Sequence, residues 1–161
     1  MNREILFRGF APDENGTEKV FVNGEWIKGK WVEGFLFKTQ EHTYIAYAEQ
    51  FDDDLFLSPK NIFVKVLPET VGQYTGLPDK NGKKIFEGGI VESRASENKE
   101  DWKRWIVTFY DGSFCFEREL PRKRKHKHER NILCEDEVKL YGLVVIGNIH
   151  DNPELLEGEA E

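Results

Sequence analysis

The stretch RWIVTFYDGSFCFER, residues 104–118, decides the fold class of this chain. A two-residue turn at Asp111-Gly112 pairs Phe109 with Phe114 across two antiparallel strands. Bulky apolar side chains then share one face of the hairpin, and smaller or polar ones share the other, as a half-buried hairpin requires. The stretch therefore predicts a β-hairpin with one face in a core.

A second hairpin is predicted in EKVFVNGEWIKG, residues 18–29, with Asn23-Gly24 as its turn. This turn pairs Phe21 with Trp26. The two faces of this hairpin are less cleanly sorted into apolar and polar residues. Turn dipeptides between short aromatic and β-branched runs are typical of a β protein.

The glycine-rich stretch VGQYTGLPDKNGKKIFEGGIV, residues 71–91, is predicted to form turns and strands rather than a ligand loop. A P-loop needs a Ser or Thr after its Gly-Lys pair and then a helix, and neither follows Gly82. The calcium loop of an EF-hand needs further oxygen ligands at fixed spacing. We expect a chain reversal at Asn81-Gly82 and a bulge or sharp bend at Gly88-Gly89.

Further strands and short helical segments follow from the same patterns. The strand candidates are residues 4–9, 32–38, 43–47, 61–67 and 139–149, and the helical candidates are residues 98–103 and 152–157. The fold class is therefore predicted to be mainly β, in the range from all-β to α+β.

A domain boundary is expected near Pro68. Residues 1–67 are predicted to form an N-terminal β-hairpin region. Residues 68–156 have strands at the spacing of a small barrel, with a basic loop near 121–131, and residues 157–161 form an acidic tail.

The composition favours a soluble, cytoplasmic protein. The chain has 161 residues, of which 13% are aromatic and 33% are charged, so we expect it to fold rather than stay disordered. Two cysteines, Cys115 and Cys134, suggest reduced thiols rather than a disulfide framework. The first thirty residues carry too many charges for a signal peptide, and no run approaches the ~20 apolar residues of a membrane-spanning helix.

No set of residues predicts a catalytic, metal or cofactor site. Cys115 lies on a strand and Cys134 precedes three acids, so neither thiol is expected to be an activated nucleophile. His126 and His128 lie among lysines and arginines, which would repel a metal cation. The acids at 52–54 fit a solvated loop better than a divalent-ion patch. We therefore expect a non-enzymatic protein without a cofactor.

A basic strip, RKRKHKHER at residues 122–130, contrasts with the rest of the chain. It carries a net charge of +5 within an overall charge of −7. Its cations, which could contact nucleic acid or another anion, are Arg122, Lys123, Arg124, Lys125, Lys127 and Arg130. A solvated loop is the favoured interpretation, because no aromatic residue is interleaved to stack bases and the rest of the protein is acidic.

Two segments resemble the signature segments of the YopX family, which is found in phages and prophages mainly of Gram-positive bacteria. They are VGQYTGLPDKNGKKIFEGGIV at residues 71–91 and VIGNIHDNPELL at residues 145–156. The N-terminal REILFRG and NGEWIKG also resemble the opening of that family. Where the family has a Gly-Asp step before its barrel strand, this chain has Gly88-Gly89.

The resemblance implies a C-terminal SH3-like barrel and assembly into a homo-oligomer, and it implies no catalytic or ligand residue. We therefore expect an uncharacterised phage or prophage protein that works as a non-enzymatic self-assembling or protein-interaction module, with itself or with a host or phage protein as partner. The alternative is a nucleic-acid-binding protein that uses the strip at 122–130.

Overall fold

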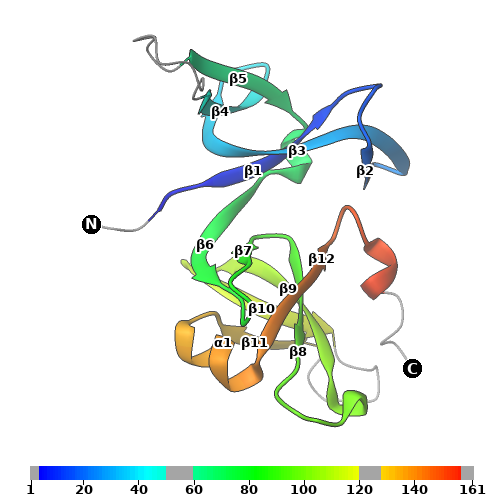
Figure 1. The fold of residues 1–161 in the computed structure, drawn as a ribbon, viewed down its shortest axis with the longest axis vertical. Coiled ribbons are helices and arrows are strands. Elements are labelled where there is room, and N and C mark those ends of the chain that lie inside the picture. Colours follow the sequence, from blue (N-terminus) through cyan, green and yellow to red (C-terminus); the bar gives the residue numbers. More distant parts are fainter. Residues whose placement is uncertain (1–3, 50–59, 120–127, 157–161) are drawn as a thin grey trace, which may run out of the picture. The chain divides into compact units, whose positions relative to one another are not determined.

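The computed structural model describes residues 4–49, 60–119 and 128–156, and the chain divides into two compact units, residues 2–73 and 74–161 (Figure 1). The described chain is mainly β, as predicted, with antiparallel strands and one α-helix. None of its described helices combines the length and the apolar character that a bilayer crossing requires. The predicted domain boundary near Pro68 stays a prediction.

Residues 2–73 form a curled antiparallel sheet. Its elements are β1 (Phe7–Pro12), β2 (Glu18–Val22), β3 (Glu25–Lys38), β4 (Thr43–Glu49), β5 (Lys60–Val66), η1 (Pro68–Thr70) and the first residues of β6 (Gly72–Pro78). The strand order is β5-β4-β3-β1-β6, and β2 pairs with β3. The end of β5 returns to β1, because Leu67 N donates to Phe10 O at 2.9 Å and Phe10 N donates to Thr70 Oγ1 at 2.9 Å.

The β2–β3 hairpin has the predicted register, with Phe21 opposite Trp26. Its turn residues Asn23 and Gly24 have φ angles of 51° and 88°. Two positive φ values in a two-residue turn are characteristic of type I′, whose twist matches that of the flanking strands. The Asn-Gly dipeptide was therefore sufficient to predict this hairpin.

The long strand β3 buries opposite faces in its two halves. Ile27 and Trp31 pack against one core cluster, which includes the fully buried Phe10. Val32 and Leu36 pack into a second cluster, around Ile45. Because side chains alternate along a strand, odd-numbered residues face a core in the first half of β3 and even-numbered residues do so in the second half.

Residues 74–161 contain a second sheet and the α-helix. The elements after β6 are β7 (Lys84–Phe86), β8 (Gly89–Ser93), η2 (Lys99–Asp101), β9 (Lys103–Tyr110), β10 (Ser113–Glu119), β11 (His128–Ile132), α1 (Glu135–Tyr141), β12 (Leu143–Asn148) and η3 (Pro153–Leu156). The five-stranded sheet has the order β11-β10-β9-β8-β12. Trp105, Phe116 and Leu143 lie at the centre of its core, with Val138 of α1 packed against them.

The β9–β10 hairpin also has the predicted register. Phe109 lies opposite Phe114, and the turn residues Asp111 and Gly112 have φ angles of 50° and 79°. Val107 and Phe116, on the predicted apolar face, are fully buried. This hairpin therefore supplies much of the core of its unit.

Two predicted features of this unit differ from the structure or are not confirmed by it. The strand predicted at residues 139–149 is wrong at its start, because α1 continues to Tyr141 and β12 begins only at Leu143. The SH3-like barrel is not confirmed, because β11 and β12 remain the two edges of an open sheet in the described residues. The sharp bend at Gly88-Gly89 is present as a turn between β7 and β8, with Gly88 at a φ of 76°.

Candidate interaction surface

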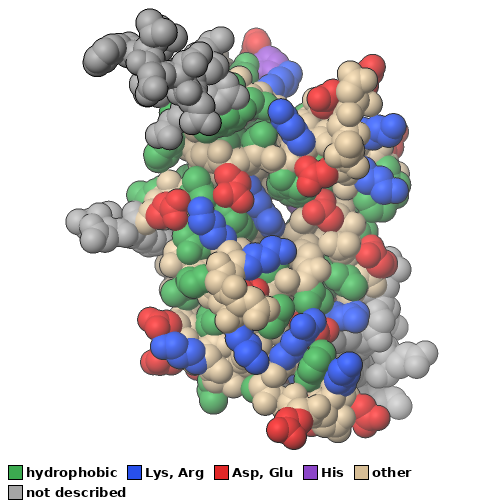
Figure 2. All heavy atoms as spheres, viewed as in Figure 1, with side chains coloured by type: hydrophobic (Ala, Val, Ile, Leu, Met, Phe, Trp, Pro, Cys, Tyr) green, Lys and Arg blue, Asp and Glu red, His purple; other side chains and the backbone are tan. Residues whose placement is uncertain are grey.

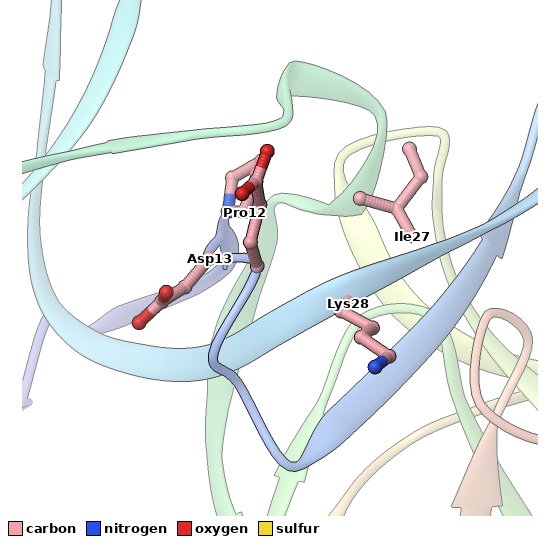
Figure 3. Close-up of a pocket in the computed structure, with 5 residues that line it drawn as sticks. Pro12, Asp13, Ile27 and Lys28 are labelled. Atoms are coloured by element: carbon pink, nitrogen blue, oxygen red, sulfur yellow. The ribbon is translucent and has the colours of Figure 1, made fainter.

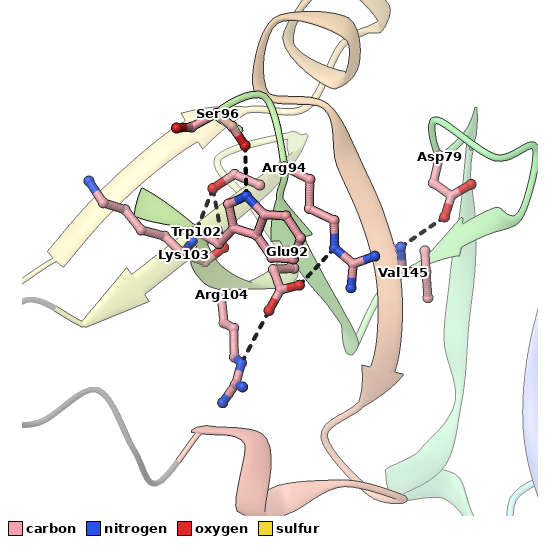
Figure 4. Close-up of polar contacts among 9 residues, drawn as sticks. Asp79, Glu92, Arg94, Ser96, Trp102, Lys103, Arg104 and Val145 are labelled. Carbon is pink, nitrogen blue, oxygen red and sulfur yellow. Dashed lines mark hydrogen bonds and ion pairs between the residues drawn. The ribbon is translucent and has the colours of Figure 1, made fainter. Parts of the chain in front are cut away.

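Asp79, in the glycine-rich stretch, is a buried carboxylate that is fully used by the fold. Its Oδ1 accepts from Asn81 N at 2.8 Å and from Lys83 N at 2.9 Å. Its Oδ2 accepts from Val145 N at 2.8 Å, as Figure 4 shows. A carboxylate with three backbone donors stabilises a turn and a strand, so this stretch is structural, as the sequence predicted.

The same turn covers the outer edge of β12. Besides the bond from Val145 to Asp79, Lys80 N donates to Leu143 O at 2.9 Å. These contacts satisfy groups that an edge strand would otherwise offer to another strand. The second family-like segment is also structural, because Asn148 Oδ1 accepts from His150 N and Asp151 N at 2.9 Å each.

A charged cluster on β8 and β9 was not found by sequence reasoning. Glu92 Oε1 accepts from Arg94 Nε at 2.8 Å, and Glu92 Oε2 lies 3.6 Å from Arg104 Nε (Figure 4). The Arg94 guanidinium lies 4.8 Å from the ring centre of Trp102, whose indole N–H donates to Ser96 O at 2.9 Å. The groups are bonded to one another, so the cluster fixes the loop between β8 and β9.

A cavity of about 800 Å³ lies within residues 74–161, between β6, α1 and the end of β8. Apolar residues such as Leu77 and Val138 line it, together with Asp79, Glu135 and Lys139. The Asp79 carboxylate is taken by backbone donors, and Lys139 Nζ donates to Glu135 Oε1 at 2.6 Å. The carboxylates that line the cavity therefore already have partners within the protein.

The cysteines and histidines that the sequence analysis considered come together at no shared site in the described part of the chain. Cys115 is buried on β10 and Cys134 is exposed just before α1, and both are free thiols. No group of three or more His, Cys, Asp or Glu residues is placed to hold a metal ion among residues 4–49, 60–119 and 128–156. His128 is exposed at the start of β11, while His126 and the acids at 52–54 lie outside the described residues.

Most of the basic strip lies outside the described residues, which leaves Arg130 as its described cation. Arg130 Nε donates to Glu117 Oε2 at 2.6 Å, and its guanidinium lies 3.7 Å from the ring centre of Tyr110. The hydrogen bond that Arg130 donates to the Glu117 carboxylate raises the pKa of Arg130. Arg130 is thus engaged within its own sheet, and the role predicted for the strip stays a prediction. The remaining cations outside the described residues are Arg122, Lys123, Arg124, Lys125 and Lys127.

The described surface that offers most to a partner is the outer face of β3, β4 and β5 in residues 2–73. Phe35 lies opposite Ala46, which lies opposite Phe63, so these side chains form one row across three strands. The next row contains Phe37 and Tyr44. We call this set the aromatic face: Phe35, Phe37, Tyr44, Ala46 and Phe63.

The aromatic face is apolar and open. Phe35, Phe37 and Phe63 are 67%, 49% and 57% exposed, whereas Ile45, which points to the other side of β4, is fully buried. The rings of Phe37 and Phe63 touch edge to face, with centroids 5.7 Å apart. In Figure 2, hydrophobic side chains reach the surface over the region of these strands. Three exposed phenylalanines on one sheet face expose roughly 350 Å² of apolar surface, which is in the range of patches that serve in recognition.

The fold and this face define a mainly β protein of two compact units that presents an aromatic surface. The model of the family described as YopX protein matches residues 6–157, and the chain belongs to that family. The resemblance predicted from residues 71–91 and 145–156 is thereby confirmed.

A solved structure shares the fold over nearly the whole chain. It is the crystal structure of protein EF1440 from Enterococcus faecalis, which is 23% identical to this chain. The match covers 95% of this chain and 98% of that one, with a TM-score of 0.52. No curated protein matches the chain. At this level of identity the likeness concerns the fold.

Proposed function

We propose that the protein is a non-enzymatic module that works by self-assembly through the aromatic face. The observation that supports this is the row of exposed phenylalanines, Phe35 and Phe63, joined by Phe37 on the same face. Removal of apolar surface from water is the main favourable contribution to protein association. A phage or prophage origin and a cytoplasmic place of action belong to the same proposal. The origin rests on the family resemblance, and the place of action rests on the composition and the two cysteines.

A second copy of the chain is the partner that we assign to this face. Homo-oligomers most often close by a two-fold axis, in which one patch meets the same patch of its partner. An exposed sheet face suits this arrangement, because two sheets pack about 10 Å apart with their inner side chains interdigitated. The aromatic face would form the apolar centre of such an interface, with Lys65, opposite Tyr44, at its polar margin.

The test is the mass of the protein in solution as a function of concentration, measured by analytical ultracentrifugation. We expect the unchanged chain to sediment as an oligomer. The double variant Phe35→Gln and Phe63→Gln is expected to weaken the association at least tenfold, because each substitution occurs twice in a two-fold dimer and buried interface aromatics each contribute more than about 1 kcal/mol.

The chain offers a matched control. Leu140 and Phe109 are 67% and 54% exposed, close to Phe35 and Phe63, but they lie in the other unit. The variant with Leu140→Gln and Phe109→Gln removes similar exposed apolar surface and is expected to associate as the unchanged chain does. A monomer at every concentration, or equal dissociation of both double variants, would contradict the proposal. Circular dichroism establishes that each variant is folded.

A further inference from the structure

The outer side of the β2–β3 hairpin is a second exposed surface in residues 2–73. Phe21 lies opposite Trp26, and Lys19 lies opposite Lys28. Lys30 follows Lys28 on the same side of β3, because side chains alternate along a strand. We call this set the hairpin face: Lys19, Phe21, Trp26, Lys28 and Lys30. The other side of the hairpin buries Val20 and Val22.

Two aromatic rings lie at the centre of the hairpin face. Phe21 is 37% exposed and Trp26 is 48% exposed. Their ring centroids are 5.3 Å apart with an interplanar angle of 53°, so each ring supports the other and both keep surface open to solvent. The Lys19 ammonium lies 4.9 Å from the ring centre of Trp26, which places a positive charge beside an exposed ring.

The charges on the hairpin face have one sign. Lys19, Lys28 and Lys30 are exposed, and none of them forms an ion pair with a residue that the structure describes. The acids of the hairpin, Glu18 and Glu25, lie on its opposite side, opposite Gly29 and Val22 in the register. Glu18 Oε2 there accepts from Trp31 N at 3.0 Å.

The nearest acidic loop leaves Lys28 available. Lys28 lines a hollow of about 330 Å³ with Asp13 and Glu14. Figure 3 shows that the Lys28 side chain extends away from the Asp13 carboxylate. The Asp13 carboxylate accepts from Asn15 N at 3.0 Å, so it has a partner within its own loop.

We propose that the hairpin face binds single-stranded nucleic acid. Bases stack on Phe21 and Trp26, and phosphates of the same strand lie against the lysines. Proteins that bind single strands without sequence preference combine these two elements, exposed aromatic rings and a row of cations. The overall charge of −7 opposes the approach of a nucleic acid, but charges more than about 8 Å away are largely screened at physiological salt, whereas direct lysine contacts remain.

An anionic membrane is the other polyanion that attracts lysines and aromatic rings. Interfacial binding depends on apolar side chains that insert between lipids. The hairpin face carries no aliphatic side chain beside its two rings, and these rings lie against each other. The surface therefore suits stacked bases better than lipid.

The test uses a fluorescein-labelled thymidine oligomer of about 12 nucleotides, a length in the range of single-strand binding sites. Fluorescence anisotropy gives the association constant over a series of salt concentrations. Three lysine contacts predict a slope of about −2 for log K against log salt. Trp26→Ala is expected to weaken binding at least fivefold without a change in slope, and Trp26→Phe is expected to restore most of it.

Two triple lysine variants with the same net charge distinguish the effect of direct lysine contacts from the effect of the overall charge. The combined substitutions Lys19→Gln, Lys28→Gln and Lys30→Gln are expected to bring the slope of log K against log salt from about −2 close to zero. Lys80→Gln, Lys83→Gln and Lys99→Gln together remove the same charge from the other unit and are expected to leave the slope unchanged.

Three outcomes would overturn the proposal: no binding of the oligomer at low salt, equal effects of the two lysine variants, or unchanged binding by Trp26→Ala. Vesicles of phosphatidylcholine and phosphatidylserine provide the remaining arm. If the protein binds the vesicles in a Trp26-dependent manner and does not bind the oligomer, the hairpin face is a membrane-binding surface and the proposal is wrong.

Discussion

Asp79 connects two parts of its unit that are distant in sequence. Its carboxylate orders the turn through Asn81 and Lys83 and also holds Val145 of β12, 66 residues further along the chain. Backbone donors that lose such an acceptor inside a protein remain without a partner at a substantial cost in free energy. The fold of residues 74–161 therefore depends strongly on this one side chain.

The substitution Asp79→Ala should lower the free energy of unfolding by about 3 kcal/mol, because three N–H groups lose a charged acceptor. Asp79→Asn keeps one carbonyl oxygen and should have a smaller effect. The measurement is urea denaturation followed by fluorescence. Glu97→Ala, which removes an exposed acid from the loop after β8, is the control and should change stability by less than about 0.5 kcal/mol. An equal effect of Asp79→Ala and Glu97→Ala would show that the carboxylate is not needed.

At the residue scale, local geometry was predictable and distant partners were not. The turns at Asn23-Gly24 and Asp111-Gly112 follow from residues that tolerate positive φ, and both formed as predicted. The sequence also predicted the chain reversal at Asn81-Gly82, which Asp79 precedes. Its bond to Val145 depends on how the sheet is assembled, which no local pattern contains.

Sequence reasoning missed the helix α1, and it also expected a loop where β11 begins at His128. The α1 segment CEDEVKLYG has three acids in the first turn and Gly142 at its end, with a φ of 57°, and both are helix signals. The pattern of residues 139–149 instead suggested one long strand. The helix signals were present in the sequence, and the apolar pattern alone was misleading because α1 and β12 follow each other directly.

The ion pair on α1 predicts a specific pH dependence. The hydrogen bond from Lys139, with its positive charge, lowers the pKa of Glu135 below the ordinary value, and the pKa of Lys139 is raised in turn. A lowered folded-state pKa means that the contribution of Glu135 to stability is present above its unfolded-state pKa and is lost as the pH falls through the folded-state value.

In an NMR titration of the side-chain carboxyl carbon, Lys139→Gln should raise the midpoint of Glu135. Lys99→Gln, which changes a lysine of the same unit away from α1, should leave that midpoint where it is. A Glu135 midpoint that does not respond to Lys139→Gln would contradict the pair.

The aromatic face and the hairpin face were also beyond sequence reasoning at the element scale. Phe35 and Phe37 alternate with Leu36, a pattern that fixes two faces of a strand without telling which face meets the core. The answer depends on where Ile45 and Val66 lie, and these come from β4 and β5. Phe21 and Trp26 were paired correctly, but their exposure could not be foreseen for the same reason.

At the scale of the molecule, the family and the mainly β class followed from the sequence, whereas the surfaces required the structure. The basic strip was the most visible charge feature of the sequence. In the structure, its described cation, Arg130, contacts Glu117 and Tyr110. The hairpin face has exposed lysines of its own, one of which, Lys19, lies over the ring of Trp26. The other five cations of the strip lie outside the described residues, so the role predicted for the strip stays a prediction.

The two thiols should report on the folding of residues 74–161 as a unit. Cys134 is exposed, so it should react with N-ethylmaleimide in the native protein, while Cys115, at 4% exposure, should react only when the unit opens. Mass spectrometry after timed labelling in increasing urea should therefore show one modification in the native state and a second one at the unfolding transition. Equal rates for both thiols in native buffer would mean that β10 is not packed as described.

The reversal of the buried side along β3 has a consequence for how the molecule could act. Because the two halves of this strand expose opposite sides, the aromatic face and the hairpin face need not compete for space. A dimer joined through the aromatic face would present two copies of the hairpin face, so the dimer would be bivalent. When two copies of the hairpin face bind the same nucleic-acid strand, binding at one copy raises the effective concentration of the strand at the other. The dimer then binds the nucleic acid more tightly than either hairpin face does alone.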